Sequence, residues 1–178
     1  MGLVANFMLA AGVIFPAIAL AQSPFQISGL HTDLVYTEAV AQAQRLGGNC
    51  QRSAEWTTDG ESVQCEYSPC LARNTGGKCI KFDLSKPGLT IAAQPILWIV
   101  LEAPAKPSRL TRISILYEGD NDVVAASLQQ AFGSPDAGAP TPEKSWSHAR
   151  RLEWTKGNYR RGFLDSPQMI ILASEQAH

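Results

Sequence analysis

The chain has 178 residues, of which 45% are hydrophobic and 17% are charged, and its formal net charge at neutral pH is -1. This composition is that of a globular protein and excludes a largely disordered chain. The near-neutral charge provides no general attraction to nucleic acid or to an anionic membrane. The length suits one compact body and is too short for two independent domains.

The N-terminal segment MGLVANFMLAAGVIFPAIALAQ carries no charge and contains an apolar run from Phe7 to Ile18. Small residues at Ala19 and Ala21 fit the pattern before a signal-peptidase site, so residues 1–21 are predicted to be a signal peptide. The same segment is long enough to span a bilayer, and a permanent anchor is the alternative. Cleavage would leave residues 22–178 as a single periplasmic or secreted domain without a stable membrane anchor.

The first predicted helix is TEAVAQAQRLGGN, with Thr37 as its N-cap and with Gly47 and Gly48 at its end. Its apolar residues recur at helical spacing and form one narrow stripe, so we expect this helix to lie on another element. The stripe comprises Ala39, Val40, Ala43 and Leu46.

Cysteines occur at Cys50, Cys65, Cys70 and Cys79. In an exported protein an even number of cysteines usually indicates disulfides. The turn-forming sequence RNTGGK lies between the last two, which favours pairing Cys70 with Cys79 and Cys50 with Cys65. A metal site or a reactive dithiol is the alternative, but only one cysteine pair approaches chelate spacing and there is no Cys-x-x-Cys.

Residues 55–118 change to extended runs separated by turn residues: SVQCEY, KCIKFDL, LTIAAQPILWIVLEA and RLTRISILYEG. In the last run Thr111, Ile113, Ile115 and Tyr117 share one side, which we expect to face a helix. The run PILWIVLEA is apolar throughout. That pattern is typical of a central strand covered on both faces, or of a strand at an interface.

The second predicted helix is DNDVVAASLQQAFGSPDAG, capped by Asp120, Asn121 or Asp122 and closed by Gly133. Its apolar stripe comprises Val124, Leu128, Ala131 and Phe132. The two aspartates also suggest a calcium site, but the loop is short for the usual set of oxygen ligands.

Two or three strands follow, RRLEWTKGNYRRGFL and QMIILASE, with a hairpin turn at 156–158. The order is helix, strands, helix, strands. We therefore predict an α+β protein with two helices packed on an antiparallel β-sheet and stapled by disulfides. Placing Gly47 over Gly133 aligns the two helices with a period of 86 residues. Two half-units, about 22–118 and 119–178, are thus a further hypothesis.

A capped helix that ends in Leu or Phe, Gly, x and Pro and is followed by antiparallel strands occurs at LQQAFGSPD. A weaker match, without the Pro, occurs at YTEAVAQAQRLGGN. This motif resembles the β-lactamase-inhibitor-like proteins and the outer-membrane-assembly lipoproteins of the SmpA/OmlA group, also called BamE. The resemblance covers less than a quarter of the chain. It implies helices packed on an antiparallel sheet and a binding rather than a catalytic role.

Common catalytic motifs are absent from the sequence, which has no Gly-x-Ser-x-Gly, no His-Glu-x-x-His, no Ser-x-x-Lys and no P-loop. His31 lies near Asp33 and is a candidate base, although a loop histidine with local hydrogen bonds is the simpler interpretation. No catalytic residue, cofactor or metal is therefore predicted. Whether the protein is an enzyme stays open, with the balance against it.

The segment KSWSHARRLEWTKGNYRRGF mixes cations with aromatic rings, as binding surfaces for anions, sugars or proteins do. A solvated hairpin whose charges protect an edge strand is the alternative. The expected partner is a protein or an acidic glycan of the envelope, not nucleic acid. The candidate binding surface comprises Lys144, Trp146, Arg150, Arg151, Trp154, Lys156, Tyr159, Arg160 and Arg161.

Together these patterns predict an exported, non-catalytic binding or inhibitor-like module. A small envelope hydrolase with an unrecognised site is one alternative. A structural component of an envelope assembly is another, and it predicts an exposed apolar patch at PILWIVL.

Overall fold

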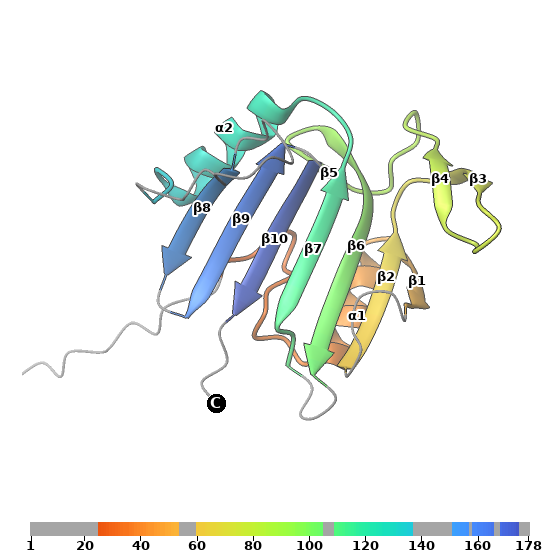
Figure 1. The fold of residues 1–178 in the computed structure, drawn as a ribbon, viewed down its shortest axis with the longest axis horizontal. Coiled ribbons are helices and arrows are strands. Elements are labelled where there is room, and N and C mark those ends of the chain that lie inside the picture. The colour runs from red at the N-terminus through yellow and green to blue at the C-terminus, as the bar shows by residue number, and fades with distance from the viewer. Residues whose placement is uncertain are drawn as a thin grey trace, which may run out of the picture.

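A computed structural model describes residues 25–53, 60–104, 109–136, 151–156, 158–165 and 168–174. The described elements, in chain order, are α1 (Tyr36–Arg45), β1 (Asn49–Arg52), β2 (Gly60–Glu66), β3 (Cys70–Arg73), β4 (Cys79–Phe82), β5 (Thr90–Ile91), β6 (Gln94–Pro104), β7 (Arg112–Tyr117), α2 (Asn121–Phe132), β8 (Arg151–Lys156), β9 (Tyr159–Asp165) and β10 (Gln168–Ser174). The prediction of an α+β fold is confirmed (Figure 1). The predicted signal peptide lies outside the described residues.

The main sheet is antiparallel and has the strand order β1-β2-β6-β7-β10-β9-β8, with β5 paired to β6 beside this path (Figure 1). In each half of the sheet the chain forms a helix first, then an edge strand, and then strands that lie progressively closer to the middle of the sheet. After α1 come β1, β2 and β6, and after α2 come β8, β9 and β10. The two halves share this plan, and a duplication of half-units stays a prediction.

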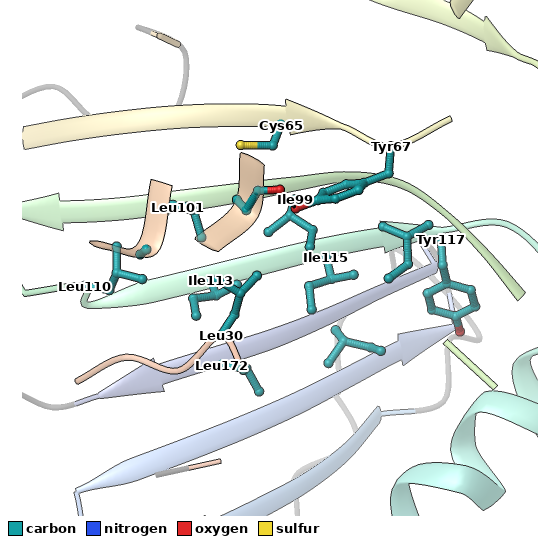
Figure 2. Close-up of a cluster of buried hydrophobic side chains, with 14 of the residues drawn as sticks. Leu30, Cys65, Tyr67, Ile99, Leu101, Leu110, Ile113, Ile115, Tyr117 and Leu172 are labelled. Atoms are coloured by element: carbon teal, nitrogen blue, oxygen red, sulfur yellow. Dashed lines mark hydrogen bonds between the residues drawn. The ribbon is translucent and has the colours of Figure 1, made fainter. Parts of the chain in front are cut away.

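Residues of both helices belong to the main core cluster, which lies on one face of the sheet. Figure 2 shows part of this cluster. Ala39 and Ala43 of α1, and Val124 and Leu128 of α2, are buried there, as their helical spacing predicts. The alternating side of β7, from Ile113 to Tyr117, is buried in the same core. Two further residues correct the predicted stripe of α2: Ala131 is exposed and Ala125 is buried.

The two helix starts differ in how they are capped. The predicted cap at Thr37 is wrong, because α1 begins at Tyr36, two residues earlier than that cap implies, and Val35 occupies its N-cap without a side-chain hydrogen bond. The predicted cap at Asp120 is confirmed: its carboxylate accepts hydrogen bonds from the backbone N–H groups of Asp122 (2.8 Å) and Val123 (3.2 Å). Capping therefore accounts for this carboxylate without a calcium ion.

Strand β6 is the central strand that the apolar run predicts. Its residues 96–101 are all buried, and it pairs with β2 on one side and β7 on the other. Ile99 and Leu101 face the helices, whereas Trp98 and Val100 belong to a second cluster that includes Phe82 of β4. The exposed apolar patch expected of an assembly component is therefore wrong at this segment, because both faces of β6 are covered.

Cys50 bonds to Cys65 and Cys70 bonds to Cys79, which is the connectivity that the spacing favours. The first disulfide joins paired positions of β1 and β2, and Cys65 is fully buried in the core. The second closes a separate two-stranded sheet of β3 and β4. Residues 69–88, which carry these two strands and the turns around them, are called the stapled hairpin below.

The two disulfides are predicted to stabilise different units. Replacing both Cys50 and Cys65 by Ala should lower the free energy of unfolding by about 3 kcal/mol, because this bond closes a loop through the main sheet. Replacing both Cys70 and Cys79 should lower it by less than about 1 kcal/mol, because the hairpin opens locally. Urea unfolding followed by tryptophan fluorescence measures both values. Equal losses would show that the hairpin unfolds together with the sheet.

Candidate functional site

The structure describes only part of the predicted basic surface. Lys144, Trp146 and Arg150 lie outside the described residues. Arg151 is the first residue of β8, and its Cα is paired with that of Leu164 in β9. The remaining predicted residues lie on β8 and β9, at the edge of the sheet opposite β1 (Figure 1).

Strand alternation divides these remaining residues between the two faces of the sheet. Trp154 and Arg161 are cross-strand partners on the helix-bearing face, and both are buried. Arg160 and Lys156 are exposed, and Tyr159 is half-buried. Trp154 and Arg161 are therefore corrections to the predicted binding surface. The run of basic residues does not form one patch, because successive side chains point to opposite faces.

Arg161 lies inside an aromatic cage. Its Cζ atom is 4.1 Å from the ring centre of Phe25, 2.9 Å from that of Phe132 and 5.7 Å from that of Trp154. Phe25 and Phe132 meet edge to face, with ring centres 5.5 Å apart. The indole Nε1 of Trp154 donates a hydrogen bond to the carbonyl of Gly133 at 2.9 Å. The cage thus ties the C-terminal end of α2 to β8 and β9.

Aromatic rings surround the charge of Arg161, and no carboxylate within the described part of the chain pairs with it. The side chain is 1% exposed, and its three guanidinium nitrogens have no hydrogen-bond partner among the residues described. Burial lowers the pKa of Arg161 to about 9, so the guanidinium still carries its charge at neutral pH. Aromatic faces attract such a cation, and the C-terminal end of a helix such as α2 favours positive charge. These contacts give Arg161 a structural role in the core.

A hollow of about 310 Å³ lies on the opposite face of β8, β9 and β10. It is called the sheet-face hollow here. Trp154 and Arg161 are among its lining residues, but their side chains point to the helix-bearing face. The other lining residues alternate with them along the strands, so their side chains point to the opposite face. At Gly162 an added Cβ would meet no atom within 4 Å, so this glycine leaves the hollow open. The lining comprises Glu153, Trp154, Thr155, Arg160, Arg161, Gly162, Ile171 and Ala173.

A smaller polar pocket of about 170 Å³ forms where the loop before α1 meets β9. The Tyr159 hydroxyl donates to Asp33 Oδ2 at 2.7 Å, and this hydrogen bond raises the pKa of Tyr159. Arg109 donates to the Asp33 carbonyl at 2.7 Å. His31 does not line this pocket, and its buried Nδ1 has no hydrogen-bond partner. The described hydrogen bonds therefore give no support to the alternative in which Asp33 orients His31 as a base.

Within the described ranges, no group of three or more His, Cys, Asp or Glu side chains could hold a metal ion. None of the helices described is long and apolar enough to cross a membrane. No family model, curated protein or solved structure matches the chain. The site therefore has to be judged from its own geometry.

The sequence signal for the sheet-face hollow was present but ambiguous. Arg160 belongs to the predicted basic surface, whereas Glu153, Thr155 and Gly162 were not singled out. A glycine inside a strand pattern indicates a place where a bulge occurs or where another molecule approaches the backbone. In the printed sequence Gly162 interrupts the strand RRGFL, and that interruption was the available clue.

Replacing Arg161 by Met tests whether its buried charge is a cost to folding. Arg161→Met should raise the free energy of unfolding by about 1–3 kcal/mol, because it removes a desolvated charge and keeps an unbranched side chain in the cage. Arg161→Ala should lower it by about 2–4 kcal/mol by leaving a cavity. Urea unfolding measures both.

Arg160→Met is the matched control for this prediction. The residue is exposed, so its replacement should change stability by no more than about 0.5 kcal/mol. A loss of stability in Arg161→Met as large as that in Arg161→Ala would contradict the prediction. It would mean that the cation itself holds α2 against the sheet.

Proposed function

We propose that this protein is an exported, non-catalytic binding module that holds a segment of a partner protein in the sheet-face hollow. The observation that carries the proposal is the hollow itself. It is a concave site of about 310 Å³ whose lining combines aliphatic side chains with a few polar groups. Sites that bind ligands are typically concave and apolar, with a small number of polar groups that fix orientation.

The chemistry of the hollow favours a protein segment over an acidic glycan. Ile171 and Ala173 give an aliphatic floor, and Glu153 and Arg160 supply one charge of each sign. An acidic glycan would be repelled by the carboxylate. Two arginines line the hollow, but Arg161 is 1% exposed, so Arg160 is the accessible cation of this lining. A peptide segment with an apolar side chain between polar neighbours matches both features.

Binding is also favoured over hydrolysis. The described lining of the hollow contains no histidine and no cysteine, and its one hydroxyl, that of Thr155, has no candidate base other than Glu153. His31 lies in the loop before α1 and lines neither this hollow nor the polar pocket. A nucleophile, a base and an orienting group within hydrogen-bond reach, which define a hydrolytic site, do not come together in these residues.

Export is part of the proposal for two reasons. All four cysteines are paired in two disulfides, and disulfides persist mainly in oxidising compartments such as the periplasm or the extracellular space. The uncharged apolar segment with small residues before position 22 fits a cleaved signal peptide. The alternative, a structural role in an envelope assembly, predicted an exposed apolar patch at β6, but residues 96–101 of this strand are buried.

The proposal predicts that filling the hollow abolishes capture of a partner. The wild-type protein is immobilised, and the protein retained from an envelope extract of its host is purified and reconstituted in solution. Gly162→Leu should weaken this complex at least tenfold, because the new side chain occupies the hollow without meeting the core. Gel filtration with light scattering checks the stoichiometry, and calorimetry checks the affinity.

Ala131→Leu is the matched control. It adds the same side chain at an exposed position of α2 and should leave the affinity unchanged. If nothing is retained, or if Gly162→Leu binds as tightly as the wild type, the hollow is not the binding site. A change in the mass of the partner during incubation would instead point to a hydrolase.

A further inference from the structure

Exposed apolar side chains gather on the stapled hairpin. The described residues expose five large apolar side chains, and three of them are on this segment: Leu71 (58% exposed), Ile80 (65%) and Leu84 (43%). Single exposed aliphatic residues are ordinary, but three within 14 positions of one small unit are unusual. The hairpin therefore presents apolar surface to whatever surrounds it.

The same segment is basic, although the chain as a whole is slightly acidic. It carries Arg73, Lys78, Lys81 and Lys86 against Asp83 alone. Arg73 forms an ion pair with Glu66 of β2, with an N–O distance of 2.5 Å. When Arg73 is set aside, the formal charges of the three lysines and the aspartate in the segment sum to +2. Lys81 and Lys86 are exposed.

The stapled hairpin is held rigidly before it meets any partner. The Cys70–Cys79 disulfide closes it, and the Asp83 N–H donates to the Pro69 carbonyl at 2.8 Å. Phe82 packs on the cluster around Trp98 and anchors the unit to the sheet. Docking through this segment would thus cost little ordering entropy.

We infer that the stapled hairpin docks on the surface of an anionic phospholipid bilayer. Lysines attract anionic head groups and aliphatic side chains insert at the boundary between head groups and acyl chains. Protein interfaces have a different composition, because lysine is depleted there and leucine is under-represented among the residues that dominate binding energy. The pairing of Lys with Leu and Ile therefore favours a lipid surface over a protein partner.

A neighbouring hollow offers room for a head group. It has a volume of about 380 Å³ and lies where the hairpin meets α1, β1 and β2. Lys86 and Arg73 line it, together with the polar side chains of Asn49 and Ser68. The Glu66 carboxylate also lines it and is paired with Arg73. A phosphate group would find Lys86 as its cation.

Vesicle binding tests the inference independently of the sheet-face hollow. Oxidised protein recovered after export is sedimented with vesicles of equal parts phosphatidylglycerol and phosphatidylcholine, or of phosphatidylcholine alone. The wild type should bind the anionic vesicles at least tenfold more strongly. Raising the salt concentration from about 0.1 M to about 0.5 M should weaken this binding severalfold, because salt screens the electrostatic attraction between the lysines and the anionic head groups.

Two double variants separate the apolar and the charged contributions. Leu71→Ser with Ile80→Ser should lower the partition coefficient at least about tenfold, because it removes the inserting side chains. Lys81→Gln with Lys86→Gln should lower it by about fivefold for each lysine removed. Val123→Ser on α2 and Lys156→Gln on β8 are matched controls at exposed positions and should bind as the wild type does.

Insertion is checked by Ile80→Trp with vesicles that contain brominated acyl chains. The anionic brominated vesicles should quench the additional fluorescence of this variant. Quenching would also confirm binding in a variant that keeps the residues holding the hairpin together. Equal binding to both kinds of vesicle, no binding, or unchanged binding by both double variants would overturn the inference. The inference would also be overturned if the protein bound no vesicles and if replacing Leu71 and Ile80 abolished its binding to a purified protein partner.

Discussion

Residues 96–101 of β6 lose nearly all contact with water, so each face of this strand requires a cover. On one face α1 supplies it through Ala39 and Ala43, which share a core cluster with Val124 and Leu128 of α2. On the other face Trp98 and Val100 pack with Phe82 of the stapled hairpin. The hairpin is thus part of what closes the second side of the core at β6. It also carries three of the five large apolar side chains that the described residues expose.

Arg161 occupies a core position because the strand places it there. Arg160 and Arg161 must point to opposite faces, and the face that takes Arg161 already holds Trp154 and Leu172 as cross-strand neighbours. The cage of rings lowers the cost of burying its charge but does not replace a carboxylate. In return, the cage connects the end of α2 to the edge strands. One basic residue therefore belongs to the core, and its neighbour belongs to the hollow on the other face.

Sequence patterns predicted the features that depend on local periodicity. The burial of β6, the apolar side of β7, the Asp120 cap and the disulfide pairing all follow from residue types and spacing. Features decided by tertiary contacts were missed. Strands β1 and β3 have four residues each and no apolar alternation, so only pairing with a neighbour defines them. The Thr37 cap was wrong because a bridge between Val35 and Arg109 positions the chain before α1.

The two candidate surfaces lie at opposite sides of the molecule. The sheet-face hollow is on β8 to β10, and the stapled hairpin stands beside β1 and β2, beyond the other edge of the sheet (Figure 1). A bilayer in contact with the hairpin would therefore leave the hollow free. The antiparallel strands between them are continuously hydrogen-bonded, so the main sheet separates the two surfaces. A rigid sheet with a lipid-facing hairpin and a distant hollow is suited to presenting a bound protein segment near a membrane surface.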